Sequence, residues 1–236
     1  MQLRRRGLPW AAAIPWPSGV RTGETVLDLG SGAGMDLLIA AERVGPDGRV
    51  IGVDMTPEMI ARARANVAAS PHRNIDIRQG IIEELPVEDG SVDWVISNCV
   101  INLSPGKEKV FAEIYRVLKP GGRFSISDIV VSELPDTLRD NPFLYNSCIA
   151  GAISEEEYLA GLEAAGMVDL EVNKRFEFPT TLLNSTELGD LFDQTGTECC
   201  ASPSAAEGLN LQQLAEELDG KVQSLNFVGR KPISTH

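Results

Sequence analysis

The stretch TVLDLGSGAG, residues 25–34, joins a short apolar run to three glycines in the pattern G-x-G-x-G. Glycine tolerates the positive φ angle of a tight turn and lets a ligand approach the backbone closely. The apolar run before the glycines is typical of a buried strand, and residues 35–44 have the pattern of a helix that ends at Gly45-Pro46. A strand, a glycine turn and a helix in this order predict a ligand site at the amino end of the helix.

Strands and helices continue to alternate along the 236-residue chain. Two further helices have capping residues at their amino ends, Thr56 for one and the capping box Ser154–Glu157 for the other. We expect further strands at 49–53, 75–78, 94–97, 123–131, 167–177 and 222–228, and further helices at 57–69, 107–118 and 154–166. Repeated β-α-β units predict an α/β fold, a doubly wound, mostly parallel sheet that binds ligands at the carboxyl ends of its strands.

The composition argues against several classes of partner. The formal net charge of −13 opposes binding to nucleic acid or to an anionic membrane. No apolar run approaches the roughly 18 residues of a membrane span, so we expect no membrane partner and a cytoplasmic location. The four cysteines, in a large acidic chain without a clear signal peptide, are expected to be free thiols.

The polar residues around the glycines favour one class of ligand. Asp28 precedes the first glycine by two residues, and Met35 stands where a dinucleotide fingerprint needs glycine. A carboxylate suits a ligand with an ammonium group, such as S-adenosylmethionine. Asp54 can accept hydrogen bonds from both ribose hydroxyls, and Met55 can lie against adenine. The loop itself would contribute Gly30, Ser31, Gly32 and Gly34.

In these motifs the sequence resembles the class I S-adenosylmethionine-dependent methyltransferases. VLDLGSGAG, VIGVDMTPEMI, the stretch from Gly80 to Pro86, and RVLKPGGR occur in the order and spacing of that family. The resemblance covers residues 22–178 and 222–232. It implies a Rossmann-like, seven-stranded sheet whose last strand is antiparallel. It also implies a methyltransferase domain at 22–236, with insertions at 132–153 and 179–221, after an atypical segment at 1–21.

The chain departs from many relatives at the adenine contact. They have an acidic residue just after the glycine of the fourth motif, where this chain has Ile81. The adenine contact would then rest on backbone amides at Ile81 and Ile82, with help from Glu83. Glu83 and Glu84 can equally be surface charges. Asn98, at the end of the fourth strand, is a further expected contact of the cofactor.

SNCVINLSP, residues 97–105, closely resembles the arsenite methyltransferases, as do VIGVDMTPEM and NSCIAGAIS. The resemblance implies that Cys99 and Cys148 bind trivalent arsenic as a dithiolate at the mouth of the reaction site. A thiolate suits such a soft, thiophilic centre. The expected partners are the trivalent arsenical and a thiol reductant of the glutathione or thioredoxin type. In-line methyl transfer would need positioning more than a strong base.

Two elements usual in that family are absent. A third cysteine upstream of the glycine loop and a G-C-G-N-P element do not occur, so we expect the start of the chain to be truncated or aberrant. By resemblance, two thiols suffice for an arsenical that already bears one methyl group. We therefore expect better activity on monomethyl arsenite than on arsenite. Cys199-Cys200 could supply another thiol, deliver arsenic, or be incidental.

Two other functions remain open from the sequence. The same cofactor loop could serve a methyltransferase of quinones, sterols or other small organic molecules. Such an enzyme usually needs a base near the cofactor, and no histidine is placed to provide one. The chain could also be a non-catalytic remnant that binds the cofactor or an arsenical without turnover, a reading supported by its unusual first 20 residues.

Overall fold

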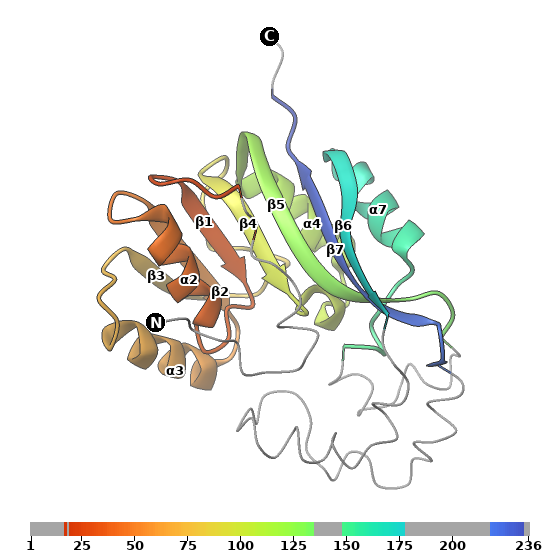
Figure 1. The fold of residues 1–236 in the computed structure, drawn as a ribbon, viewed down its shortest axis with the longest axis horizontal. Helices are drawn as coiled ribbons and strands as arrows, with labels where there is room; N and C mark the ends of the chain where they lie inside the picture. The colour runs from red at the N-terminus through yellow and green to blue at the C-terminus, as the bar shows by residue number, and fades with distance from the viewer. Residues whose placement is uncertain (1–16, 18, 135–147, 178–217, 234–236) are drawn as a thin grey trace, which may run out of the picture.

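The computed structural model describes residues 17, 19–134, 148–177 and 218–233. Its described strands form one seven-stranded sheet in the order β3-β2-β1-β4-β5-β7-β6 (Figure 1). The strands are β1 (Thr25–Leu29), β2 (Arg49–Asp54), β3 (Ile75–Gln79), β4 (Val92–Asn98), β5 (Leu118–Val131), β6 (Val168–Glu177) and β7 (Val222–Arg230). The helices are α2 (Met35–Val44), α3 (Pro57–Ala68), α4 (Lys107–Val117) and α7 (Glu155–Ala164), with a 3-10 turn η1 (Ile101–Leu103).

The direction of the strands confirms the predicted fold class. The five strands from β3 to β5 are parallel to their neighbours, whereas β7 pairs antiparallel with both β5 and β6. In Figure 1, β1, β4 and β5 all end at the lower edge of the sheet. The loops that follow these strands are therefore neighbours in space, as the doubly wound topology requires.

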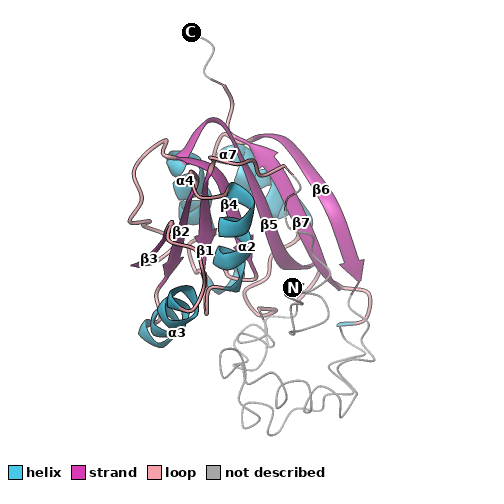
Figure 2. Ribbon diagram, turned by 60° about the vertical axis from the view of Figure 1, so that its left-hand side comes forward, coloured by secondary structure: helices cyan, strands magenta, loops and turns pink. Residues whose placement is uncertain are grey.

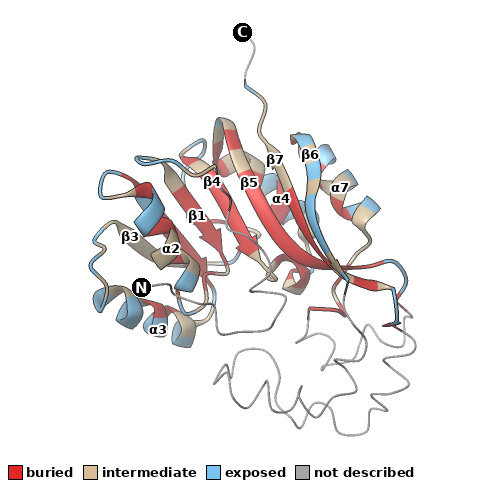
Figure 3. Cartoon of the chain, in the orientation of Figure 1, coloured by how far each residue is buried: buried red, intermediate tan, exposed pale blue. Residues whose placement is uncertain are grey.

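Two apolar cores bury the two faces of the sheet. Figure 2 shows α2 on one face, with α4 and α7 on the other. Successive residues of a strand point to opposite faces, so Val26 packs with α2 while Leu27 belongs to the core beneath α4 and α7. The buried residues are concentrated in the central strands, as Figure 3 shows. Burial on both faces explains why these strands read as continuous apolar runs.

The observed elements differ from the predicted ones mainly at their ends. β1 and α2 have the predicted bounds, and the capping box of Ser154 and Glu157 is confirmed, with both of its hydrogen bonds present. Thr56 occupies the N-cap of α3, but its side chain makes no capping hydrogen bond, contrary to the prediction. β5 begins at Leu118, before the glycines that were expected to separate helix from strand, because Leu118 already pairs with Val92 of β4.

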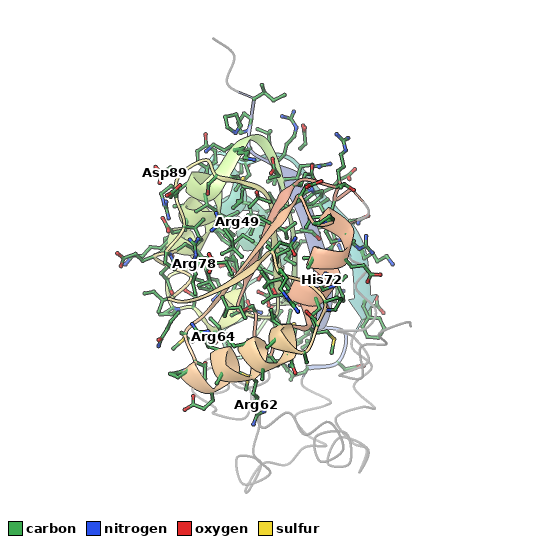
Figure 4. The ribbon with its side chains drawn as sticks, turned by 90° about the vertical axis from the view of Figure 1, so that its left-hand side faces the viewer. Arg49, Arg62, Arg64, His72, Arg78 and Asp89 are labelled. Atoms are coloured by element: carbon green, nitrogen blue, oxygen red, sulfur yellow. The ribbon has the colours of Figure 1, made fainter. Side chains whose placement is uncertain are left out.

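Charged side chains lie on and beside the edge strand β3. Arg78 of β3 and Arg49 of β2 both donate hydrogen bonds to Asp76, and these ion pairs lower the pKa of the Asp76 carboxyl despite its partial burial. Figure 4, which faces this edge, shows Arg49 and Arg78 together with Arg62 and Arg64 of α3. Charged side chains at an edge discourage pairing with a strand of another molecule.

The predicted division of the chain is not tested by these residues. Most of the expected insertions at 132–153 and 179–221, and most of the atypical segment 1–21, lie outside the described part of the chain. The division therefore stays a prediction. In the part that is described, no helix has both the length and the apolar character needed to cross a membrane.

Candidate functional site

The glycine loop between β1 and α2 has the backbone that its sequence predicts. Gly30, Gly32 and Gly34 have φ angles of 63°, 51° and 84°, all in the left-handed region where a side chain is disfavoured. Gly34 is also the N-cap of α2, so the loop leads directly into the amino end of that helix. Backbone amides and the helix dipole together favour polar ligand groups at this position.

Asp54, the last residue of β2, is hydrogen-bonded to the glycine loop. One carboxylate oxygen accepts a hydrogen bond from the amide of Gly32 and the other from the amide of Thr56, each at 2.8 Å. A carboxylate oxygen has two lone pairs, so each can still accept a bond from a ligand hydroxyl. Asp28 is buried beneath the loop, and the buried hydroxyl of Ser31 has no partner among the described residues.

Large apolar side chains are exposed around this loop. Met55 is 68% exposed, Ile81 46% and Met35 45%, and only one other large hydrophobic in the described chain is classed as exposed. They follow the ends of β2, β3 and β1, so they border the same edge of the sheet. Exposed apolar side chains beside hydrogen-bonding groups suit a ligand with a flat aromatic part.

The residues expected near adenine are arranged differently from one another. Ile82 is buried in the core, whereas the exposed Ile81 forms a backbone bridge with Glu84. Glu83 does not stand free as a surface charge, because its carboxylate accepts a hydrogen bond from the hydroxyl of Ser104. Ser104 follows η1, so this bond connects the loop after β3 to the turn that carries Cys99.

Cys99 and Cys148, 49 residues apart in the sequence, are neighbours in the structure. The thiol of Cys148 donates a hydrogen bond of 3.0 Å to the carbonyl oxygen of Cys99. Both residues have positive φ angles, 54° for Cys99 and 61° for Cys148, which are uncommon for residues with a side chain. Such strain costs on the order of 1–3 kcal/mol per residue and is concentrated at functional sites. Neither Cys99 nor Cys148 forms a disulfide bond, and Cys199 and Cys200 lie outside the described residues.

The turn that carries Cys99 lies directly against the glycine loop. A side chain on Gly30 would place its Cβ 2.5 Å from a methyl group of Val100, so the two segments are in van der Waals contact. On the other side of Cys99, the side-chain amide of Asn98 donates a hydrogen bond of 2.7 Å to Asp36 in the first turn of α2. The turn that carries Cys99 and the segment from the glycine loop to α2 are therefore in direct contact on both sides of Cys99.

A buried polar group beneath the thiols was not predicted from the sequence. The carboxylate of Asp128 in β5 is fully buried and accepts hydrogen bonds from the amides of Asn102 and Ile129 and from the hydroxyl of Tyr158. The signal was one charged residue, Asp128, within the continuously buried part of β5, residues 124–131. A buried charge needs hydrogen-bond partners, and two of them, Asn102 and Tyr158, come from η1 and α7, far away in the sequence.

Burial also shifts the ionisation of this group. It raises the pKa of the Asp128 carboxyl to about 7, although its hydrogen bonds and the charge of Lys107 act in the opposite direction. Burial, followed by the charge of Asp128 and the nearness of Cys148, raises the pKa of the Cys99 thiol well above its ordinary value. Cys99 is therefore a protonated thiol at neutral pH before any ligand binds.

Comparisons with known proteins identify the family of the chain. A family model described as a methyltransferase domain matches residues 21–166. An arsenite methyltransferase of Halobacterium salinarum is 53% identical over 156 residues, and one of Aquipseudomonas alcaligenes is 46% identical over 145 residues. These matches cover 66% and 57% of this chain but only 40% and 42% of the two relatives. The chain thus spans less than half the length of the curated relatives it matches.

A solved structure resembles almost the whole chain. The crystal structure of an arsenic(III) S-adenosylmethionine methyltransferase from Chlamydomonas reinhardtii superposes with a TM-score of 0.71 and 33% sequence identity. The match covers 94% of this chain and 68% of that structure. The similarity therefore extends beyond the region matched by the family model.

The glycine loop gives a first test. Gly30→Ala would combine a left-handed φ angle with an overlap on Val100, so we expect the affinity for S-adenosylmethionine to fall by at least about tenfold, or roughly 1.4 kcal/mol. Gly90→Ala is the matched control, because Gly90 has a φ angle of 56° and no atom within 4 Å of the added Cβ. Calorimetric titration of both variants checks this, and equal affinities would contradict it.

The buried carboxyl gives a second test, in the pH dependence of stability. The folded protein keeps the Asp128 proton up to about pH 7, whereas the unfolded chain releases it near the ordinary pKa of 3.8. Raising the pH between these values therefore destabilises the fold. Relative to Asp128→Asn, the free energy of unfolding should fall by roughly 1.4 kcal/mol per pH unit in this window. Denaturant titrations at several pH values measure it, and a constant difference would count against the assignment.

Proposed function

The chain belongs to the family of methyltransferase domains, and we propose that it transfers a methyl group from S-adenosylmethionine to trivalent arsenic bound by Cys99 and Cys148. The similarity to two curated arsenite methyltransferases and to the structure from Chlamydomonas reinhardtii supports this substrate. The observation that carries the proposal is the hydrogen bond between the Cys148 thiol and the Cys99 carbonyl, since it joins two cysteine segments that are distant in the sequence.

The residues around the glycine loop fit the cofactor. Asp54 retains lone pairs for the ribose hydroxyls, and exposed Met55 and Ile81 offer apolar surface for adenine. The acidic residues Asp28 and Asp36 suit the positive charge of its methionine half. When bound, S-adenosylmethionine supplies a methyl group carried on a positively charged sulfonium. The proposed contacts are Asp28, Gly30, Ser31, Gly32, Gly34, Asp54, Met55, Ile81, Ile82, Glu83 and Asn98, and the carboxylate of Glu83 keeps lone pairs for a ligand while it accepts the hydrogen bond from Ser104.

In binding arsenic, each of the two cysteine sulfurs would replace one hydroxyl group of the arsenical. Each S–H and As–OH pair forms one As–S bond and releases one water, so the thiol proton leaves with the hydroxyl. The raised pKa of Cys99 is compatible with this step, because no free thiolate has to exist beforehand. Two As–S bonds leave the third position of trivalent arsenic for a methyl or hydroxyl group and keep its lone pair available.

The role of the protein in the transfer is then positioning. The arsenic lone pair forms the As–C bond as the C–S bond of the donor breaks, and arsenic passes from the trivalent to the pentavalent state. Holding the reacting atoms in line can supply several kcal/mol of the barrier. Return to trivalent arsenic needs two electrons, which a dithiol or two thiols of the glutathione or thioredoxin type supply by forming a disulfide.

Substitution of either cysteine tests the proposal. Cys99→Ser and Cys148→Ser should each lower the rate of arsenical methylation on the order of 100-fold, because one sulfur cannot hold arsenic in line with the methyl group. The affinity for S-adenosylmethionine serves as the control and should stay within about twofold. Mass spectrometry of the methylated products measures the rate in the presence of a thiol reductant. An unaffected rate in Cys99→Ser would instead favour a small organic substrate such as a quinone or sterol.

A second prediction concerns the arsenical itself. A site of two thiols completes the coordination of an arsenic that already carries a methyl group, but leaves a hydroxyl on arsenite. We expect kcat/KM for monomethyl arsenite to exceed that for arsenite on the order of tenfold, or about 1.4 kcal/mol. Initial rates with each substrate, measured on the purified 236-residue chain, provide the ratio. Equal values would mean that a third ligand completes the site.

A further inference from the structure

The turn that carries Cys148 is attached to the turn that carries Cys99 by one buried side chain, that of Asn102 in η1. Its amide nitrogen donates hydrogen bonds to the carbonyl oxygens of Cys148, at 3.1 Å, and of Ile129, at 2.7 Å. Asn102 is only 1% exposed. One side-chain amide therefore connects three segments that are far apart in the sequence: the turn after β4, strand β5, and the segment that begins at Cys148.

The backbone of Asn102 is fixed as well. Its amide donates to the carboxylate of Asp128, and its carbonyl oxygen accepts a long hydrogen bond of 3.5 Å from the ammonium group of Lys107. Gly151 lies directly against this carbonyl oxygen, since a Cβ built on Gly151 would be 2.0 Å from it. The segment from Cys148 to Gly151 thus approaches η1 so closely that only glycine fits at its third residue after Cys148.

This attachment matters most once arsenic binds. In the free protein the Cys148 thiol donates to the Cys99 carbonyl, and this bond is lost when the thiol gives up its proton to form As–S. The bond from Asn102 to the Cys148 carbonyl involves no thiol atom and therefore persists. It also opposes relaxation of the left-handed backbone at Cys148, whose φ angle is 61°.

We infer that Asn102 is a positioning residue that holds the Cys148 segment at the distance from Cys99 at which both sulfurs bind one arsenic atom. The inference rests on the proposed function, because it assigns Asn102 a role in the dithiol site. With the second thiol held in place, its reaction with an arsenic already bound to Cys99 is intramolecular, and the affinity of the chelate reflects that effective concentration.

The experiment uses the full chain with Cys199 and Cys200 both changed to serine, so that a trivalent arsenical can be chelated only by Cys99 and Cys148. The probe is phenylarsine oxide, which binds two thiols, and its affinity is measured by competition with a small dithiol. In Asn102→Ala we expect the dissociation constant to rise on the order of tenfold. The rate at which iodoacetamide alkylates Cys99, which needs only one thiol, should change by less than about twofold.

Two further variants separate positioning from general destabilisation. Asn74→Ala is the matched control, because the amide of Asn74 also donates to two carbonyl oxygens, those of Gly45 and Gly48, far from the thiols. It should leave the chelate unchanged. Gly151→Ala perturbs the same attachment from the other side and should weaken the chelate as Asn102→Ala does. If Asn102→Ala does not fold, the affinity of Gly151→Ala for phenylarsine oxide tests the inference by itself.

The possible outcomes are distinct. Weaker chelation in Asn102→Ala or Gly151→Ala, with Asn74→Ala unchanged, supports the inference. Unchanged chelation in both, or an equal loss in Asn74→Ala, overturns it while leaving the dithiol site intact. Failure of the Cys199→Ser, Cys200→Ser background itself to chelate phenylarsine oxide would instead contradict the proposed function, and the inference with it.

Discussion

The parallel arrangement of β1, β4 and β5 brings the two halves of the site together. The strands end at one edge of the sheet, so the glycine loop after β1 and the thiol turn after β4 must be neighbours. Their contact is close enough that Gly30 cannot carry a side chain without striking Val100. Asn98 and Asp36 join the same two segments on the other side of Cys99. The sheet therefore brings together the two segments to which we assign the methyl donor and the acceptor.

Backbone hydrogen bonds and buried polar groups then hold the backbone of the two cysteines in an unfavourable conformation. Cys99 and Cys148 both have left-handed φ angles, and the surrounding contacts maintain them. The amide of Cys99 donates to the carbonyl of Ser127, while Asn102 binds the carbonyl of Cys148. Asp128 supports the backbone of Asn102 from below. Strain at the two cysteines is consistent with a site in which sulfur positions are set before a ligand arrives.

Much of this was accessible from the sequence, for identifiable reasons. The glycine loop and β1 were predicted with their observed bounds, because apolar runs and glycine patterns are local signals. The proposed pairing of the two cysteines came from resemblance and stays a prediction, while the structure shows a hydrogen bond between the two residues. Asp128 and Asn102 were missed, because their role depends on contacts between η1, β5 and α7 that no local pattern encodes. The bond between Glu83 and Ser104 was missed for the same reason.

In the function that we propose, one arsenic atom is bound by two sulfurs of this chain beside the glycine loop. X-ray absorption at the arsenic edge, recorded on the protein with one equivalent of monomethyl arsenite and with Cys199 and Cys200 changed to serine, tests it most directly. We expect two sulfur neighbours and one carbon neighbour for each arsenic. A spectrum with only one sulfur neighbour, or with oxygen neighbours alone, would contradict it.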